Sequence, residues 1–580
     1  MKSFYHVTTG ALVDVVHCQR ELQARSCTDE SCRIDGASGA LYLSGDGAST
    51  GPLSLREGRA WRAFAFSQRP LLAPRVFSHE LEDLLGDLPP ERALERAIDH
   101  LRVHEEERLW LLISPRYDAV IALRDPLGLC PLYVLERGGE FALTNTYRAL
   151  TPALRDQPFD EETIAELLAF ALPLSATRSA YHGLSRVPAG HAWIRVGARA
   201  RVQRWWSWTQ VPLELPDWTS ALNAYRQKFS HAVEARTEAL PTLLELSGGM
   251  DSNGIAAVAS MGRHRHLLRA VTYVDSNGAT SLERPLAALS AERLKIPLTI
   301  GDVQGAPTLR PPAPYGFAGP NPLLQLLPDD GTPAIVLSGQ GGDPLFAITP
   351  GDIDRIFREI PLRQMPKLVR LQQTLHGSLP PFFLRRRLAG GKIERDIDDR
   401  RVPWVPKERW ESLSRDTREA NLRTRQLPGR QAMCENPYWQ TWFEITDPGF
   451  TGVPLRWRFP FFDLPLMRTL AALPAAPFLL DKKIAREAWA MRLPSEITTR
   501  PKTLAPTPRD GVAIDPLPPD ELLQSDAMRP IHALVDVTAI QRFENNPSIW
   551  PAWSRFSARN TVQVLRWLVE DTQQRERQKP

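Results

Sequence analysis

The chain has 580 residues, of which 43% are hydrophobic and 24% are charged. These shares are typical of globular proteins and exclude a fibre, a wholly disordered chain and a small disulfide-stapled scaffold. The 71 basic and 67 acidic residues give a net charge of +4, which is only weak support for nucleic-acid binding.

The N-terminal segment does not resemble a signal peptide, because Asp14 interrupts its only apolar run. No apolar run reaches the length of about 18 residues that a membrane-spanning helix needs. The five cysteines form no CxxC pair and have no zinc-site spacing. Together these features predict a cytoplasmic protein.

Residues 1–205 are predicted to form short strands with a few helices. Helical patterns occur at 90–103 and 160–171. Apolar runs broken by Gly, Pro or Asp predict strands within 40–47, 62–70, 109–125, 131–145 and 191–208. This balance favours layered sheets with flanking helices.

A different pattern follows a linker-like segment at 204–218. Strands and helices alternate over 220–350, which predicts a doubly wound parallel sheet. Beyond 350 the chain is expected to be largely helical. The segment 385–401 mixes charges of both signs and predicts a solvated loop or, alternatively, a patch for a peptide or protein partner.

The first motif, SGGMDS at 247–252, lies where a buried strand is expected to turn into a helix. Backbone N–H groups at a helix start attract anions, and two glycines allow a phosphate to approach closely. Asp251 would repel a phosphate, so it is better suited to hold a Mg²⁺ ion that bridges phosphates. Taken alone, the motif is equally consistent with a glycine turn that caps a helix. It lacks the Walker pattern and resembles the pyrophosphate loop of ATP pyrophosphatases.

The second motif, SGQGGDPLF at 338–346, repeats the arrangement of strand, glycine loop and carboxylate. Two aspartates at adjacent strand ends can share Mg²⁺ around a triphosphate. Asp343 alone could be a helix N-cap, but a second such unit in the chain weakens that interpretation. The third motif, LPSEITTRPK at 493–502, would by itself be a helix end followed by a surface lysine.

Five motifs in order resemble those of the asparagine synthetase family over roughly 220–510. They are the three above, RFPFFD at 458–463, which carries one extra Phe, and Lys482 with Arg486. The resemblance implies ATP and Mg²⁺ as cofactors, Asp251 and Asp343 as metal ligands, and Lys502 as the catalytic lysine. It also implies that the following residues bind ATP or pyrophosphate: Ser247, Gly248, Gly249, Asp251, Ser252, Ser338 and Gly339.

The N-terminal region resembles the glutaminase domain of the same family. RDPLGLCPLY at 124–133 and LSRVPAGH at 184–191 are similar to two of its segments. We therefore expect 1–205 to be a degenerate, Ntn-hydrolase-like αββα sandwich, and 219–580 to be the synthetase domain with its doubly wound ATP-pyrophosphatase sheet and helical extension. A working glutaminase of this class has a cysteine after the initiator Met. Here that residue is Lys2, so we expect no glutamine hydrolysis.

Two departures from the family argue against free aspartate as the substrate. Gln340 and Arg456 stand where asparagine synthetases usually carry Glu. An intact ATP site beside a glutaminase domain that is expected to be inactive suggests that the attacking amine belongs to the substrate, as in the lasso-peptide macrolactam synthetases of this family. Glu435, Tyr438 and Glu444 are weak candidates for a general base.

The sequence thus predicts a lasso peptide cyclase that adenylates an Asp or Glu side chain and closes an isopeptide bond with the peptide's N-terminal amine. Its expected partners are a precursor peptide, a leader peptidase and a leader-recognition protein, with no nucleic acid and no membrane span. The alternatives are an asparagine synthetase-like or β-lactam synthetase-like amide ligase for a small molecule, and a non-catalytic ATP-binding scaffold.

Overall fold

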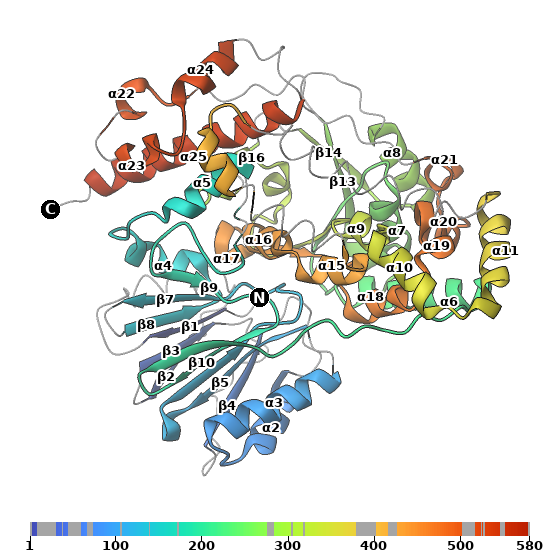
Figure 1. Ribbon diagram of the computed structural model, residues 1–580, viewed down its shortest axis with the longest axis horizontal. Coiled ribbons are helices and arrows are strands. Elements are labelled where there is room, and N and C mark those ends of the chain that lie inside the picture. Colours follow the sequence, from blue (N-terminus) through green and yellow to red (C-terminus); the bar gives the residue numbers. More distant parts are fainter. Residues whose placement is uncertain are drawn as a thin grey trace.

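Two antiparallel sheets form the N-terminal part of the computed structural model (Figure 1). The structure describes residues 3–7, 31–36, 39–44, 60–66, 74–104, 107–137, 140–170, 173, 175–274, 283–302, 306–316, 319–378, 402–413, 415, 426–501, 517–523, 525, 528–545 and 552–577. The strands are β1 (Ser3–Val7), β2 (Ser31–Gly36), β3 (Gly39–Ser44), β4 (Arg62–Phe66), β5 (Leu109–Ser114), β6 (Ala119–Leu123), β7 (Tyr133–Arg137), β8 (Glu140–Thr144), β9 (Leu184–Arg186), β10 (His191–Val196) and β11 (Arg199–Arg204). One sheet has the order β2-β3-β1-β8-β7-β9, and the other has the order β11-β10-β6-β5-β4.

The two sheets pack face to face around a buried apolar layer. Leu109, Leu111 and Val120 of one sheet meet Val134 and Leu143 of the other in a single cluster, as expected where side chains alternate along each strand. Helices α2 (Pro74–Leu85) and α3 (Pro90–His104) cover the outer face of the five-stranded sheet. Helices α4 (Tyr147–Leu154) and α5 (Glu161–Phe170) cover the six-stranded sheet. The predicted αββα sandwich is confirmed.

A third sheet is fully parallel and has the order β14-β13-β12-β17-β18. Its strands are β12 (Thr242–Glu245), β13 (Leu268–Val274), β14 (Leu298–Asp302), β17 (Ala334–Leu337) and β18 (Leu455–Arg458). Strands β12, β13, β14 and β17 lie within 220–350, where an alternation of strands and helices is predicted. The edge strand β18 is not expected, because it lies within the part predicted to be largely helical.

Helices cover one face of this sheet. They include α6 (Trp218–Glu234), α7 (Met250–Ala259) and α8 (Glu283–Leu294), which share one buried cluster with side chains of the sheet. The opposite face packs on the short helix η3 (Pro322–Leu326). A parallel sheet layered in this way confirms the predicted α/β fold of the C-terminal part.

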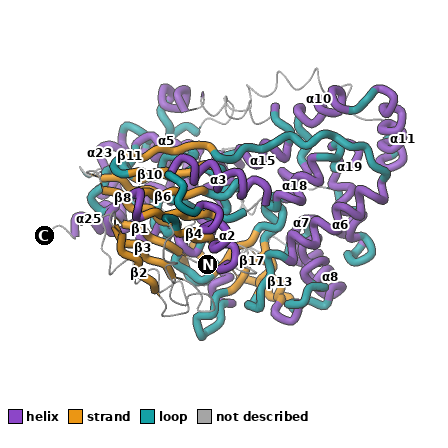
Figure 2. Tube along the Cα trace, turned by 90° about the horizontal axis from the view of Figure 1, so that it is seen from below, coloured by secondary structure: helices purple, strands orange, loops and turns teal. Residues whose placement is uncertain are grey.

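The remaining elements are those of the helical extension beyond residue 350 and several short elements that precede it in the chain. They are β15 (Thr308–Leu309), β16 (Gly319–Pro320), α9 (Gly342–Phe346), α10 (Pro350–Glu359), α11 (Met365–His376), α15 (Gly429–Glu435), α16 (Pro437–Thr446), α17 (Pro448–Thr451), α18 (Leu464–Ala471), α19 (Ala475–Phe478), α20 (Lys483–Trp489), α21 (Ser495–Thr498), α22 (Asp520–Leu523), α23 (Arg529–His532), α24 (Val537–Asn545) and α25 (Ala552–Arg577), with the short helices η1 (Pro115–Tyr117), η2 (Arg265–Leu267), η4 (Leu362–Gln364) and η5 (Leu480–Lys482). Figure 2 shows the sandwich strands on one side of the molecule and α6, α10, α11 and α18 on the other.

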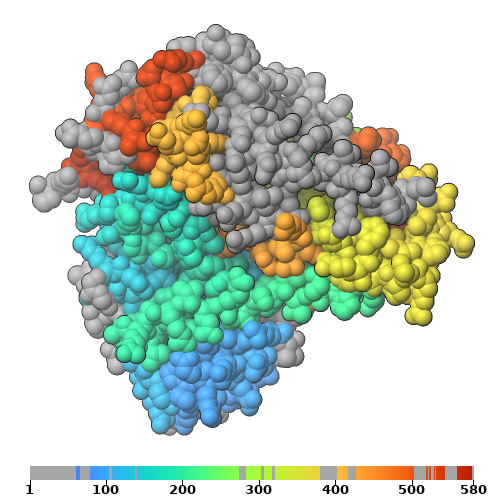
Figure 3. Space-filling model, viewed as in Figure 1, coloured from blue at the N-terminus to red at the C-terminus, as the bar shows by residue number. Residues whose placement is uncertain are grey.

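An extended segment at 205–217 crosses the surface from the sandwich to α6 (Figure 3). Its backbone is held by α10 and α11, since Leu213 N donates to Glu359 Oε2 at 3.0 Å and Lys367 Nζ donates to Leu215 O at 2.9 Å. The division of the chain into 1–205 and 219–580 stays a prediction. The charged segment 385–401 lies outside the described residues.

The C-terminal helix returns to the sandwich. Leu565 and Leu568 of α25 share a buried cluster with Ile164 and Leu167 of α5. Helix α5, which covers the six-stranded sheet, is therefore itself covered by the C-terminal helix α25 (Figure 1). None of the helices in the described ranges combines the length and apolar character required to cross a membrane.

Candidate active site

Both glycine-rich motifs lie at the carboxyl edge of the parallel sheet. The loop 246–249 joins β12 to α7, and the loop 338–341 joins the neighbouring β17 to α9. Open α/β sheets bind ligands outside the carboxyl ends of their strands. The topology therefore brings the two predicted motifs together at the edge where a nucleotide would bind.

The two loops touch, and their glycines make the approach possible. A Cβ atom on Gly339 would lie 3.1 Å from the backbone N of Ser252, and a Cβ on Gly342 would overlap the Asp251 carboxyl group. Gly341 has a φ of +90°, a conformation that favours glycine. Larger residues at these positions would push the loops apart and separate their aspartates.

The first loop presents hydrogen-bond donors at the start of α7. Gly249 is the N-cap residue and offers no side chain to cap the helix. Ser247 and Ser252 face each other, with their Oγ atoms 3.0 Å apart. The backbone N of Gly248 donates to Glu283 Oε2 at 3.1 Å, and the backbone N atoms of Ser247 and Gly249 donate to the Oγ atoms of Ser252 and Ser247, both at 3.1 Å. A ligand anion would replace these protein oxygens. This arrangement suits an anion such as pyrophosphate.

A lysine holds the two predicted metal ligands together. Lys482 Nζ lies 2.6 Å from Asp251 Oδ2 and 2.6 Å from Asp343 Oδ1. Two carboxylates that converge on one ammonium group have the oxygen chemistry that Mg²⁺ requires. No cluster of three or more His, Cys, Asp or Glu side chains within the described ranges could hold a metal ion. The two aspartates would therefore have to share Mg²⁺ with phosphate oxygens, which fits the predicted site.

The turn that carries this lysine has an unusual backbone. Asp481 and Lys482 both have positive φ values, of 51° and 55°. Such residues are uncommon and concentrate at functional sites. Arg486 supports the turn, because its Nε donates to Asp481 O at 2.7 Å and its Nη1 donates to Thr498 O at 2.9 Å. This arginine thus connects the Lys482 turn to the third motif.

A partly buried carboxylate lies at the centre of the same edge. Glu245 is the last residue of β12; its Oε2 accepts from Ser338 Oγ at 2.8 Å, and its Oε1 accepts from Tyr273 Oη at 3.0 Å. Burial raises the pKa of Glu245, although these two hydrogen bonds lower it. Glu245 therefore connects the ends of three neighbouring strands.

The structure brings most of the predicted site residues to one place. Ser247, Gly248, Gly249, Asp251 and Ser252 lie on the first loop and helix start, and Ser338, Gly339 and Asp343 on the second. Lys502 lies outside the described residues, so its predicted role stays a prediction.

The sequence reasoning assigned no role to Lys482, Glu283 or Glu245. Lys482 belongs to one of the predicted motifs, although no role was assigned to it, whereas Glu283 and Glu245 carry no signal that distinguishes them from ordinary surface or strand-end acids.

The three weak candidates for a general base differ in how exposed they are and in their hydrogen bonds. Glu444 is buried and accepts from Tyr315 Oη at 2.7 Å and from Arg186 Nη1 at 3.1 Å, so it has no access to a substrate proton. Glu435 is exposed and accepts from Gln431. Tyr438 is partly buried, which raises its pKa. Gln340 is exposed at the tip of the second loop, whereas Arg456 is buried in β18.

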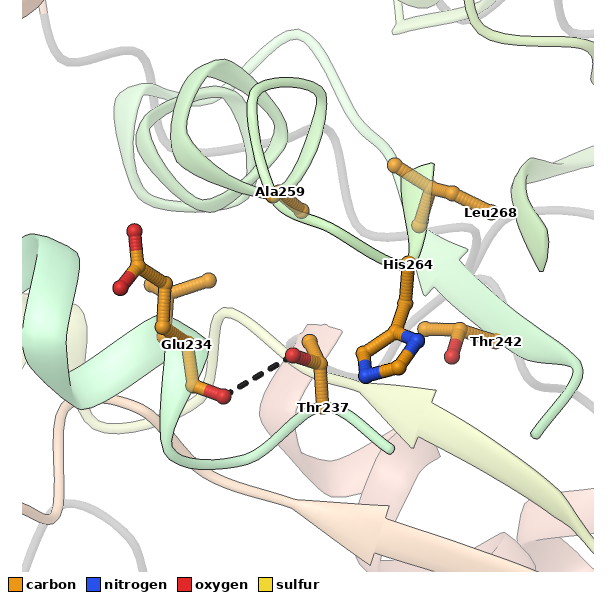
Figure 4. Close-up of a pocket in the computed structure, with 8 residues that line it drawn as sticks. Glu234, Thr237, Thr242, Ala259, His264 and Leu268 are labelled. Carbon is orange, nitrogen blue, oxygen red and sulfur yellow. Dashed lines mark hydrogen bonds between the residues drawn. The ribbon is translucent and has the colours of Figure 1, made fainter. Parts of the chain in front are cut away.

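A small pocket at the opposite edge of the sheet is not the site (Figure 4). It lies where β12 and β13 begin, because Thr242 and Leu268 are their first residues. Its titratable side chains are Glu234 and His264. The pocket contains none of the predicted site residues.

The comparisons with known proteins agree with this geometry. Residues 224–569 match the asparagine synthase family. The chain belongs to this family. Membership indicates an ATP-dependent amide-forming ligase. The search of curated proteins found no match.

Solved structures add little. They include glutamine phosphoribosylpyrophosphate amidotransferase from B. subtilis in complex with ADP and GMP, with 12% identity, a TM-score of 0.23 and coverage of 60% of this chain and 77% of that one. A second, the allosteric regulatory enzyme of purine biosynthesis, has the same identity and TM-score, with coverage of 58% and 74%. Scores this low carry no argument, so the fold assignment rests on the sheets described above.

Proposed function

We propose that this asparagine synthase family member is a lasso peptide cyclase. It would adenylate an Asp or Glu side chain of a core peptide and join it to the peptide's N-terminal amine. The observation that carries the activation step is the convergence of Asp251 and Asp343 on one cation beside the glycine loop that begins α7. Such an edge can hold a Mg²⁺–triphosphate and the pyrophosphate that leaves it.

In the first step, a carboxylate oxygen of the peptide attacks the α-phosphorus of ATP and the bond to the β-phosphate breaks. Ser247, Ser252 and the N–H groups of the first loop would hold the departing pyrophosphate. Asp251 and Asp343 would hold Mg²⁺, which supplies positive charge to the phosphates.

In the second step, the amine attacks the acyl carbon, loses a proton and expels AMP. Lys502 would place positive charge beside the developing oxyanion. The peptide loses one water in total.

Two thiols whose environments are described support an amine supplied by the substrate rather than by glutamine. Burial, followed by the nearby Asp125 and Asp447 carboxylates, raises the pKa of the Cys130 thiol well above its ordinary value. Burial also raises the pKa of Cys434. Neither thiol is poised as a thiolate nucleophile. A peptide α-amine has a pKa near 8 and needs little help to attack.

The surroundings of the second loop favour a peptide over free aspartate. Gln340 places a neutral amide at the exposed tip of the loop, where asparagine synthetases usually have a carboxylate. Arg456 stands where the family usually has a second Glu; it is buried in β18 and carries a positive charge instead of a carboxylate. These differences remove the expected contacts to a free amino acid.

The deciding experiment uses the full chain with ATP, Mg²⁺ and a leader-free peptide that carries an Asp or Glu several residues from its N-terminus. We expect AMP and pyrophosphate to be released and the peptide to lose one water, with fragmentation placing the new bond between the N-terminus and that side chain. An acetylated N-terminus should block closure. Efficient formation of asparagine from aspartate and ammonia, without peptide dehydration, would instead support a small-molecule ligase.

Because the core peptide has to be free of its leader, we also propose a leader peptidase and a leader-recognition protein as partners. Adding the peptidase to the uncut precursor peptide should allow cyclisation, whereas the uncut precursor alone should not cyclise. The physical reason is that only cleavage creates the attacking α-amine.

A further inference from the structure

The carboxyl edge of the parallel sheet has two chemically different sides. On the side of α7 lie the candidates for metal and pyrophosphate binding, Asp251 and Lys482. On the other side, strand alternation places Glu245 on the same face as Leu243, which packs in the cluster that contains Val271 and Val336. Tyr273 also packs against that cluster. A nucleotide that lies across this edge meets charged ligands on one side and the Glu245 carboxylate on the other.

Two hydrogen bonds fix the Glu245 carboxylate, and no cationic side chain of the described residues is among its hydrogen-bond partners. Among the described residues, its hydrogen-bond donors are the hydroxyl groups of Ser338 and Tyr273. A carboxylate has about four acceptor positions, so two hydrogen bonds leave others available. Ser338 Oγ in turn accepts from Gln340 N at 3.4 Å. The carboxylate is thus held in a single place at the base of the second loop.

Electrostatics decides which part of a nucleotide can lie beside this group. A phosphate next to an unpaired carboxylate would be repelled, because like charges disfavour each other strongly where water is scarce. A neutral hydrogen-bond donor would be attracted, and hydrogen bonds to charged acceptors are the stronger ones. The nucleoside carries such donors in its ribose hydroxyls and, for adenine, in its exocyclic amino group.

We infer that Glu245 is a specificity-determining residue for the nucleotide, and that its carboxylate accepts a hydrogen bond from a neutral donor of the nucleoside. Ser338 and Tyr273 are positioning residues that hold the carboxylate. The inference rests only on the ATP-binding part of the proposed function, and it is independent of which carboxylate is activated.

The experiment measures nucleotide binding to the full chain by calorimetry with Mg²⁺ and without peptide. Four nucleotides are compared: ATP, 2′-deoxyATP, 3′-deoxyATP and inosine triphosphate, which lacks the amino group. For the wild type we expect at least one analogue to bind about ten-fold more weakly than ATP, the scale of a hydrogen bond to a charged group. The analogue that loses affinity shows whether the donor is on the ribose or on the base.

The informative variant is Glu245→Gln, which keeps the shape and removes the charge. It should bind ATP about ten-fold more weakly and lose most of the discrimination against that analogue. Glu292→Gln, at an exposed position of α8, is the matched control and should behave as the wild type. Tyr273→Phe removes one of the two hydrogen bonds that position the carboxylate and should weaken the discrimination in part, which keeps the inference testable if Glu245→Gln does not fold.

Three outcomes would overturn the inference. One is equal binding of all four nucleotides by the wild type. Another is an equal loss for ATP and all analogues in Glu245→Gln, which would indicate a purely structural carboxylate. A wild type that does not bind ATP would overturn the nucleotide site itself, and with it the activation step proposed above.

Discussion

The two parts of the chain treat their motif residues in opposite ways. In the sandwich, Arg124 donates to the backbone carbonyls of Gly128 and Cys130 and to Gln440 of α16. At the parallel sheet, Asp251 and Asp343 face each other across a single ammonium group. In the first case the motif completes its own hydrogen bonds within the protein. In the second, the motifs bring together charged side chains whose interactions a bound ligand would complete.

Contacts with helix α16 show that motif residues of the sandwich hold the two parts of the chain together. Arg186 of β9 donates to Glu444 and Thr441 on this helix, and all three are buried. At a second contact, Arg236 of the C-terminal part bridges Glu107 and Asp463 at 2.9 and 3.0 Å. The comparison teaches that residues of a segment similar to a catalytic one can also hold two parts of a protein together, so the similarity by itself does not indicate catalysis.

The largest expected effect is at the paired aspartates. Asp251→Asn or Asp343→Asn should abolish pyrophosphate release, because each change removes a carboxylate from the cation that binds the phosphates. Asp330→Asn, at an exposed position, is the control. Pyrophosphate release assayed over a range of Mg²⁺ concentrations checks the prediction. Wild-type turnover in either variant would mean that these carboxylates are not metal ligands.

The next effect concerns Lys502. Lys502→Ala should still bind ATP but form product at least about 100-fold more slowly, the scale for a preorganised charge at the transition state. Lys502→Arg should not restore the rate, because a planar guanidinium differs in shape from a compact ammonium. Single-turnover kinetics separates binding from chemistry. An unchanged rate in Lys502→Ala would show that it is an ordinary surface residue.

A smaller effect is expected at Lys482, which occupies the place between the aspartates. Lys482→Met should raise the affinity of the nucleotide-free protein for Mn²⁺ about ten-fold, because an ammonium no longer competes for both carboxylates. A titration followed by electron paramagnetic resonance measures this directly. The neighbouring Lys483 pairs with Glu487 at 2.8 Å, and Lys483→Met is the control. Weaker or unchanged Mn²⁺ binding in Lys482→Met would contradict the idea of competition.

In the sandwich, substitutions should change stability rather than chemistry. Glu444→Gln leaves the buried Arg186 without its charged partner and should lower the free energy of unfolding by about 3–5 kcal/mol. The double variant Arg186→Met, Glu444→Leu should lose less, because no charge is then left unpaired. Denaturant unfolding measures both. An unaltered stability in Glu444→Gln, with a changed kcat, would instead give Glu444 a catalytic role.

The sequence predicted those parts of the molecule that depend on local patterns. Short apolar runs marked β5, β6, β12 and β17, and the glycine loops had to follow the ends of β12 and β17. The edge strand β18 could not be predicted, because its partner β17 lies more than a hundred residues earlier and its four residues include two arginines. Lys482 stands in a predicted motif, but its contact with both aspartates could not be predicted, since only the fold places its turn between the two loops.

The smallest expected effect is that of glutamine, which should be none. The thiol of Cys130 is fully buried, and burial with its acidic neighbours raises its pKa, so it cannot supply a thiolate at neutral pH. Incubation of the full chain with glutamine should release no glutamate above background, and adding glutamine should not change the rate of peptide dehydration. Cys130→Ala should behave identically in both assays. Glutamate release by the wild type would show that the sandwich is still a glutaminase, and the contrast between its inward-facing motif and the ligand-binding edge of the parallel sheet would no longer hold.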